Sequence, residues 1–377
     1  MPHILTINAG SSSVRYALFA NGNEPRRLLD GKIERLGSES AAAAAKRVVQ
    51  ELQAKSSVGV PDAVGHRVVH GLAHSQPEVI SDILIAELRE VQSLDPEHLP
   101  REIEIIAAMQ REYPKAPHVA CFDTAFHRGM PTVAAMLPIP RRYFAKGVQR
   151  YGFHGLSYTF LLKELSRLND PAAAKGRVIL AHLGGGASIA AVLNGKSIDT
   201  SMAFTPSAGL VMGTRAGDLD PGLMSYLART ESMSAAQFQT LVNHESGLKG
   251  ISETSADVRD LLERENADPR AREALAIFCY QAKKWIGAFA AALGGVDTLV
   301  FAGGIGENSA EVRRRICEGL QHLGIEIDDA LNRRHAARIS TDRVTVRVIA
   351  TDEESVIAGL TARLLGMQKE EGNNGTR

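Results

Sequence analysis

The sequence predicts an α/β protein with two domains of similar construction, because one pattern of strands and turns occurs twice. Residues 4–19 are predicted to form a strand, a polar turn at 8–13 and a second strand. About half a chain later, residues 177–193 repeat this order, with the glycine-rich turn 184–188 between two apolar strands. An internal repeat of this kind indicates two domains of one architecture.

A third glycine turn, Gly303–Asn308, follows the apolar strand predicted at Thr298–Ala302 and precedes a helix. A strand that leads through a glycine turn into a helix N-terminus suits phosphate or nucleotide binding, since backbone amides face the ligand there. Any one of the three turns alone is more often an ordinary tight turn. The three together favour phosphate binding, with the hydroxyls of Ser11, Ser13 and Ser188 as further donors.

The remaining elements follow from the spacing of apolar residues. The predicted strands are 4–7, 14–19, 63–69, 119–122, 177–183, 189–193, 298–302 and 344–350, and the predicted helices are 41–54, 83–91, 102–113, 235–243, 270–293 and 310–323. A length of 377 residues also favours two domains, at about 100–200 residues per domain.

The composition describes a globular chain without a dominant charge. The 43 Lys+Arg balance 43 Asp+Glu, which argues against a mainly electrostatic nucleic-acid binder. Cys121, Cys279 and Cys317 are widely spaced and odd in number, so we expect neither a disulfide framework nor a zinc site. The N-terminus has no secretory pattern, and the longest near-apolar run, 286–296, is too short to span a membrane. We therefore expect a cytoplasmic protein with no membrane or nucleic-acid partner.

Residues 190–197 nearly spell a P-loop, with alanine in the first position. A P-loop requires a helix after its Lys-Ser pair, so that backbone amides face the phosphates. Here Asn194-Gly195 predicts a tight hairpin, and the residues that follow are predicted to be extended. We therefore do not assign a P-loop, and the missing GxGxxG pattern also argues against a Rossmann fold.

Oxygen-bearing side chains follow several predicted strands. Asn8, Asp123 and Glu353 each lie after an apolar strand, and such strand ends gather at a cleft in α/β proteins. Magnesium prefers oxygen ligands and often takes only one or two carboxylates together with phosphates. Helix capping is the alternative, and it is equally open for Asp352 and Glu353.

Two arginines and one histidine occupy unusual places in the sequence. Arg67 lies within an apolar strand, Arg215 lies between glycines, and His154 lies in an aromatic and glycine-rich loop. An arginine in such a place is costly to bury unless it is paired or meets an anion. A salt bridge remains an equal alternative for each arginine, and a structural role for the histidine. Four other histidines, His118, His244, His322 and His335, are expected at the surface.

Together these segments resemble the acetate kinase family, which belongs to the superfamily of acetate and sugar kinases, actin and chaperone ATPases. The resemblance extends from Asn8 to Glu354. Its most specific stretches are 122–127 (FDTAFH), 151–155 (YGFHG), 199–206 (DTSMAFTP), 213–221 (GTRAGDLDP) and 303–308 (GGIGEN).

The resemblance implies ATP-dependent, reversible phosphorylation of acetate to acetyl phosphate by direct in-line transfer. It implies Mg²⁺ as cofactor, which Mn²⁺ can replace, with ATP or ADP as co-substrate. The implied fold is α/β, with two actin-like (ribonuclease H-like) domains around a central cleft and a duplicated βββαβαβα core. The expected domains are residues 1–122 with 353–377, and residues 123–352, and a homodimer is expected.

The family's site residues can be carried over position by position. Expected catalytic residues are Asp123, His154, Arg215 and Arg67, and expected substrate-binding residues are Arg67, Val69, His98, Phe153 and Pro206. Expected nucleotide-binding residues are Ser11, Ser13, Arg15, His182, Leu183, Gly184, Gly185, Gly186, Asp257, Val258, Arg259, Gly304, Ile305, Gly306, Glu307 and Asn308. Asn8 and Glu353 are the expected metal ligands.

The sequence departs from the family pattern at several of these positions. Arg15 stands where lysine is usual, Gly185 where asparagine is usual, and Glu97 where the acyl pocket is usually apolar. A buried anion beside a carboxylate substrate is unfavourable, so Glu97 either points away or lines a different acyl pocket. A propionate or butyrate kinase therefore remains an alternative, as does a non-catalytic nucleotide-binding regulator on the same fold. The phosphoryl donor also remains open.

Overall fold

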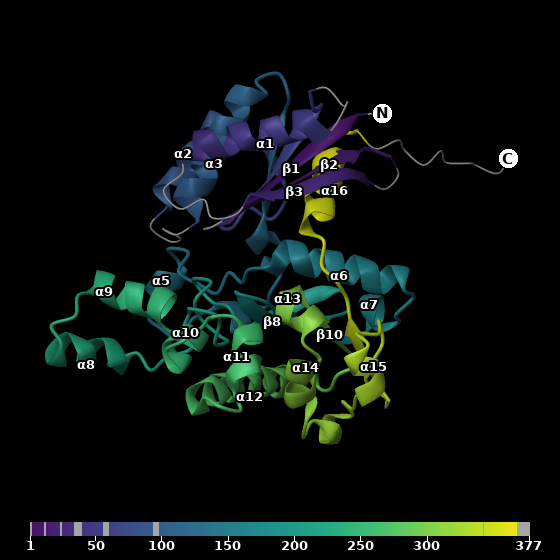
Figure 1. The fold of residues 1–377 in the computed structure, drawn as a ribbon. Coiled ribbons are helices and arrows are strands. Elements are labelled where there is room, and N and C mark those ends of the chain that lie inside the picture. The colour runs from purple at the N-terminus through teal and green to yellow at the C-terminus, as the bar shows by residue number, and fades with distance from the viewer. Residues whose placement is uncertain are drawn as a thin grey trace. The chain divides into compact units, whose positions relative to one another are not determined.

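The computed structural model describes residues 2–10, 13–22, 25–33, 40–55, 60–92, 98–341 and 343–367. The chain divides into two compact units, which are drawn in Figure 1. Unit 1 comprises Met1–Phe126, Gly155–Phe160 and Asp352–Arg377, and unit 2 comprises His127–His154 and Leu161–Thr351. The domain boundaries expected from the sequence, at residues 122 and 353, stay a prediction.

Unit 1 contains a mixed sheet whose order is β3-β2-β1-β4-β6-β5. Its strands are β1 (His3–Ala9), β2 (Val14–Ala20), β3 (Arg26–Ile33), β4 (Ala63–Val68), β5 (Glu78–Val79) and β6 (His118–Phe122). Strand β1 pairs antiparallel with β2 and parallel with β4, which in turn pairs parallel with β6. The carboxyl ends of β1, β4 and β6 therefore lie at one edge of the sheet.

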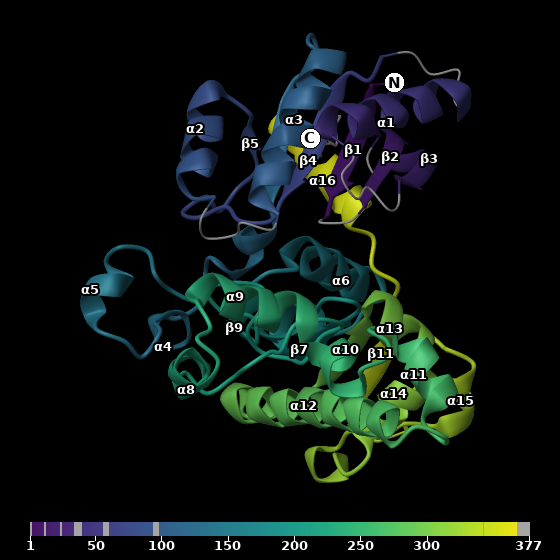
Figure 2. The same ribbon diagram turned by 60° about the vertical axis from the view of Figure 1, so that its left-hand side comes forward.

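Helices cover both faces of this sheet. One core joins α1 (Ala41–Lys55) and α3 (Leu99–Glu112) to Leu5 and Ile7 of β1. On the other face, Ile4 packs with α16 (Glu353–Leu364), and Figure 2 shows α16 behind the sheet when α1 and α3 are in front. Side chains alternate between the two faces along a strand, so Ile4 and Leu5 belong to different cores. Helix α2 (Asp82–Glu90) packs beside α3.

Unit 2 repeats the arrangement in a sheet of order β11-β10-β7-β8-β9. Its strands are β7 (Arg177–Leu183), β8 (Ala187–Leu193), β9 (Lys196–Thr200), β10 (Thr298–Ala302) and β11 (Thr345–Val348). Strand β7 pairs antiparallel with β8 and parallel with β10, as β1 does with β2 and β4. The predicted repeat and the duplicated α/β fold class are therefore confirmed.

Helices account for most of the rest of unit 2, and the 25-residue helix α12 packs against β7 and β8 (Figure 2). The α-helices that follow β6 and precede α16 are α4 (Thr132–Ala135), α5 (Arg141–Phe144), α6 (Gly155–Arg167), α7 (Ala172–Lys175), α8 (Gly222–Thr230), α9 (Ala235–Thr240), α10 (Gly247–Ser252), α11 (Val258–Arg264), α12 (Pro269–Leu293), α13 (Gly303–Asn308), α14 (Ala310–Cys317) and α15 (Asp329–Arg333). Asp123–His127 and Gln321–Leu323 form 3₁₀-helices, and Leu241–Glu245 forms a turn of π-helix. In the part of the chain that the structure describes, no helix is long and apolar enough to cross a membrane.

Two predicted helices end earlier than the sequence suggests. The helix predicted at 235–243 ends at Thr240 and continues as π-helix. The helix predicted at 310–323 ends at Cys317, where the chain turns through Gly319 with a φ of 83°. A positive φ suits glycine and is incompatible with a continuing helix. The P-loop is correctly excluded, because Asn194 and Gly195 form a hairpin turn between β8 and β9.

The expectation that His118 lies at the surface is wrong. His118 is buried in β6, and its Nδ1 lies 2.9 Å from Nε2 of the buried His66 in β4. His118 Nε2 donates to the Tyr113 carbonyl at 3.2 Å, so its Nδ1 accepts from His66 Nε2. His66 Nδ1 then carries no proton and has no hydrogen-bond partner among the described residues. Burial disfavours the charged form of both rings and lowers the pKa of each, so we expect both to be neutral in the folded protein near pH 7.

This pair predicts a loss of stability in acid. Burial lowers the pKa of His66 well below its ordinary value of 6.5, and burial also lowers the pKa of His118. The unfolded chain takes up protons below about pH 6.5 that the folded pair refuses, so stability is greatest above that pH and falls as the pH drops. Each histidine contributes up to about 1.4 kcal/mol per pH unit. Urea unfolding at several pH values between about 7.5 and 5.5 measures this slope.

A glutamine variant isolates the contribution of the histidine pair from that of the other titrating groups. His118→Gln keeps a polar side chain but does not titrate, so the stability should fall less steeply with pH. His322→Gln, at an exposed histidine, should leave the slope unchanged. A His118→Gln slope equal to that of the parent protein would contradict the assignment.

Candidate functional site

The carboxyl ends of β4 and β6 bring Arg67 and Asp123 together in unit 1. Arg67 donates to Asp123 Oδ2 through Nε at 3.1 Å and through Nη2 at 2.6 Å. The Asp123 side chain is fully buried, and its Oδ1 accepts from the Leu156 backbone N–H at 3.2 Å. Arg67 thus has the salt bridge that the sequence left open, and this bridge fixes the direction of its guanidinium group.

Asn8, at the end of β1, contacts the first turn of α16. Its Nδ2 donates to Glu353 Oε2 at 2.8 Å and to Glu354 Oε1 at 3.2 Å. The cap of this helix is Asp352, which accepts from the Ser355 N–H. The sequence left helix capping and a place in the site open for both acids. In the structure Asp352 caps the helix, while Glu353 is directed to Asn8.

Opposing charges act on this group of side chains. Burial alone lowers the pKa of Arg67, but the charges of Asp123, Glu353 and Glu102 reverse this, and the pKa is raised. Burial also raises the pKa of Glu353, an effect that Arg67 partly offsets. The pKa of Glu354 is raised for the same reason, burial, and by its neighbour Glu353. A cation beside these carboxylates would favour their charged forms.

The donor chemistry of this group fits Mg²⁺. The side-chain nitrogen of Asn8 donates to the two glutamates. Its side-chain oxygen, Oδ1, is therefore left as a possible metal ligand beside the Glu353 carboxylate. Oxygen donors with only one or two carboxylates are the usual protein contribution to a magnesium site. Among the residues that the structure describes, no three His, Cys, Asp or Glu side chains could hold a metal ion alone.

The other expected residues of unit 1 lie around these strand ends. Arg15 on β2 is the cross-strand partner of Asn8, and Ser13 closes the preceding turn by accepting from the Gly10 N–H. Val69 is buried after β4, and His98 lies at the N-terminus of α3. Ser11 and Glu97 lie outside the described residues.

In unit 2 the second and third glycine turns adjoin, because β7 and β10 are parallel neighbours. His182 pairs with Ala302 in the register of these strands, so both turns leave the same edge of the sheet. A Cβ on Gly303 would lie 2.7 Å from the Leu183 carbonyl oxygen, and a Cβ on Gly184 would lie 3.9 Å from the Gly304 nitrogen. The two turns therefore lie next to each other at one edge of the sheet.

His154 and Arg215 flank the first of these two turns. A Cβ on Gly186 would lie 3.6 Å from His154 Nε2 and 3.7 Å from Arg215 Nη1. The His154 ring stacks on His182 at 4.3 Å between centroids, and its Nδ1 lies 2.9 Å from Ser188 Oγ. Its own φ of 59° is in the left-handed region, which a non-glycine residue adopts at a cost. Two cationic or hydrogen-bonding groups therefore face a bare glycine backbone.

The turn at α13 is held by two charged side chains. Glu307 Oε1 accepts from the backbone N–H groups of Gly303 at 2.9 Å and of Thr351 at 3.1 Å. Arg313, which is fully buried, donates through Nη1 to the carbonyls of Gly306 at 2.7 Å and Glu307 at 2.9 Å. Burial lowers the pKa of Arg313 to about 10. This arginine fixes the backbone of the expected nucleotide segment.

The remaining expected residues of unit 2 lie near the same elements or at other helix ends. Phe153 is buried, and its carbonyl oxygen is 3.1 Å from His127 Nε2. Pro206 is buried, and its carbonyl accepts from Arg215 Nη1 at 3.4 Å. Asp257 caps α11 and pairs with the exposed Arg259.

Sequence reasoning missed Arg313 and also Glu102, whose Oε2 accepts from the Val69 N–H at 3.0 Å. Glu102 is 2% exposed, so it is a buried acid behind an expected substrate residue. The available signal was a charged residue on an apolar helix face, beside Ile103 and Ile106 for Glu102 and beside Val312 and Ile316 for Arg313. That signal marks burial with partners, but it does not say which backbone groups the partners are.

Two sheets of related strand order, one in each unit, define a duplicated α/β fold of the actin-like class. Comparison with known proteins identifies the family. The sequence profile of the Acetokinase family matches residues 38–359. The acetate kinase of Methylocella silvestris is 41% identical over 398 aligned positions, which cover 96% of this chain and 98% of that protein. The chain belongs to the Acetokinase family of phosphotransferases.

Solved structures agree in fold over almost the whole chain. The acetate kinase of Porphyromonas gingivalis superposes with a TM-score of 0.88 at 35% identity, covering 97% of this chain and all of that one. A propionate kinase from Francisella tularensis superposes with a TM-score of 0.85 at 33% identity, covering 96% of this chain and all of that one.

Proposed function

We propose that the protein transfers the γ-phosphoryl group of ATP reversibly to acetate, forming acetyl phosphate and ADP. The observation that carries the proposal is the buried Arg67–Asp123 pair beside Asn8 and Glu353, in a chain of the Acetokinase family. Glycine turns that present backbone amides, flanked by His154 and Arg215, support the same reaction.

The proposed phosphoryl transfer does not need a general base. A carboxylate is already an anionic nucleophile, so the protein must mainly align two anions and compensate the charge that spreads over the transferring group. Arg67, oriented by Asp123, binds the acceptor carboxylate. Arg215 and His154 donate to the phosphoryl oxygens as their charge develops. The segments 184–186 and 304–308 hold the nucleotide, with backbone amides of these segments as donors to its phosphates.

Magnesium completes the proposed charge balance. Asn8 and Glu353 would hold the ion, which when bound neutralises phosphate charge, and Mn²⁺ is expected to replace it. Arg15, on the strand next to Asn8, places a further cation near these acids. Val69, His98, Phe153 and Pro206 form the proposed acyl contacts.

The acyl group is the part of the proposal that most needs an experiment. The purified protein is incubated with ATP, Mg²⁺ and hydroxylamine, and with formate, acetate, propionate or butyrate, and acyl hydroxamate is measured. Acetate is expected to give the highest kcat/KM. A higher kcat/KM for propionate would favour a propionate kinase instead. The similarity to the Francisella propionate kinase supports this second candidate. Formation of no hydroxamate with any of these acids would exclude both kinases.

We also propose that the protein works in the cytoplasm as a homodimer. The family resemblance and the balanced charge of the chain support this proposal. Light scattering coupled to size-exclusion chromatography tests the dimer, and a monomeric mass would contradict it.

A further inference from the structure

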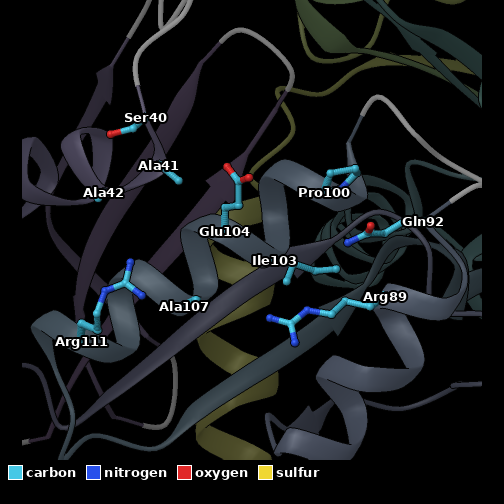
Figure 3. A pocket seen from close by; sticks show the side chains of 10 residues that line it. All are labelled: Ser40, Ala41, Ala42, Arg89, Gln92, Pro100, Ile103, Glu104, Ala107 and Arg111. Atoms are coloured by element: carbon cyan, nitrogen blue, oxygen red, sulfur yellow. The ribbon is translucent and has the colours of Figure 1, made fainter.

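A cavity of about 560 Å³ lies on unit 1, and its described lining includes none of the residues assigned to the proposed reaction. It is lined by the start of α1, the end of α2 and one face of α3, as Figure 3 shows. Small-molecule sites typically occupy about 300–1,000 Å³ and combine an apolar lining with a few polar groups. The volume of this cavity fits a ligand site, and its lining is more polar than is usual for one, which suits a charged ligand.

One face of α3 supplies most of the lining. Pro100, Ile103, Glu104, Ala107 and Arg111 recur at helical spacing, so they share that face. The opposite face of α3 carries Glu102, which is bonded to the Val69 N–H. The cavity therefore lies on the outer side of the helix whose inner side supports an expected substrate residue.

The charged groups at the cavity are Arg89, Glu104 and Arg111. Arg89 reaches from α2 toward α3, and Arg111 lies at the far end of the row on α3 (Figure 3). Within the described residues, neither arginine makes a side-chain hydrogen bond or ion pair, and the same holds for Glu104. Residues 34–39 and 93–97, which flank the lining residues Ser40 and Gln92 in sequence, lie outside the described ranges.

We propose that this cavity binds a small dicarboxylate that also carries a hydroxyl or amino group. The two guanidinium groups supply forked donors for two carboxylates, an arrangement that arginine makes better than lysine. Ala107, with the small exposed part of the buried Ile103, supplies an apolar surface for the carbon skeleton. Glu104 would repel a simple dianion, but it accepts a hydrogen bond from a hydroxyl or ammonium group. The site thus selects a substituted dicarboxylate over an unsubstituted one.

Isothermal titration of the full chain with L-malate, L-aspartate and succinate tests the proposal, with acetate and ADP present to occupy the proposed active site. Malate or aspartate is expected to bind within the range up to about 10 mM. Succinate, which lacks the donor for Glu104, is expected to bind roughly fivefold or more weakly. Because binding is measured directly, its outcome is independent of the kinase activity.

Three exposed residues give the decisive variants. Arg89→Gln and Arg111→Gln should each weaken binding about tenfold or more, and Glu104→Gln should reduce the preference for malate over succinate. Arg26→Gln, at an exposed arginine on β3, is the matched control and should bind as the parent does. Absence of binding by all three probes would overturn the proposal, and so would binding that Arg89→Gln and Arg111→Gln leave unchanged.

Discussion

Replacing Arg215 by alanine is expected to lower kcat about 10³-fold or more while the KM for ATP changes only a few-fold. The guanidinium of Arg215 lies beside the backbone of Gly186, close to His154, whose imidazole lacks the permanent charge and the forked donors of a guanidinium. An arginine that stabilises a transferring phosphoryl group contributes about 10³–10⁵ to the rate of such reactions. The nucleotide itself is held mainly by backbone amides, so its ground-state binding should survive.

Steady-state kinetics with ATP and acetate measure this effect. Arg215→Lys keeps a positive charge but loses the forked donors, so it should recover only part of the lost rate. Arg272→Ala, at an exposed arginine on α12, is the matched control and should retain the parent rate. An unchanged kcat in Arg215→Ala would refute the role proposed for this residue.

Replacing Arg313 by methionine should destabilise unit 2 and weaken nucleotide binding together. The side chain is fully buried, and its nitrogens also donate to Asn332, through Nε to Oδ1 at 2.8 Å and through Nη2 to the carbonyl at 2.9 Å. Methionine fills similar space but leaves these buried acceptors without donors, at a cost of about 3 kcal/mol or more. Because the carbonyls of Gly306 and Glu307 belong to the nucleotide turn, the KM for ATP should rise about tenfold.

Arg314 provides the comparison within the same helix. It is partly exposed and pairs with Glu311 and Glu318, so Arg314→Met should cost less than about 1 kcal/mol and leave the KM for ATP unchanged. Urea unfolding and initial-rate kinetics on both variants separate the two cases. If Arg313→Met matched Arg314→Met in both measurements, the proposed support of the turn would be wrong.

The fold was largely predictable because the central strands have a clear apolar pattern in the sequence. The strands 177–183 and 298–302 were predicted at their observed bounds, since each is a short apolar run that ends at glycine. Strand β3 was missed because Arg26–Ile33 carries four charged residues and lacks a clean alternation of buried and exposed positions. Helix α8 was also missed; it is only nine residues long, and none of its residues is buried.

Site residues that lie in a segment resembling the family could be predicted from the sequence. Contacts between residues that are distant in the sequence could not. Arg67, Asp123 and Glu353 were expected from their places in such segments, and the structure brings them together with Asn8. The surface assignment of His118 failed because only the pairing of β4 with β6 places it against His66.

The two units share a strand order but should differ in which amino-acid substitutions they tolerate. At corresponding strand ends, unit 1 presents side chains such as Asn8 and Arg67, whereas unit 2 presents peptide groups uncovered by glycine. In a map of all single substitutions, the sensitive positions of unit 1 should therefore be those where a functional group is removed. The sensitive positions of unit 2 should include those where any side chain at all is added, as at Gly303, where a methyl group already meets the Leu183 carbonyl. Two units of the same architecture would thus differ in what selection removes: the loss of a functional side chain in unit 1 and the gain of any side chain at glycine in unit 2.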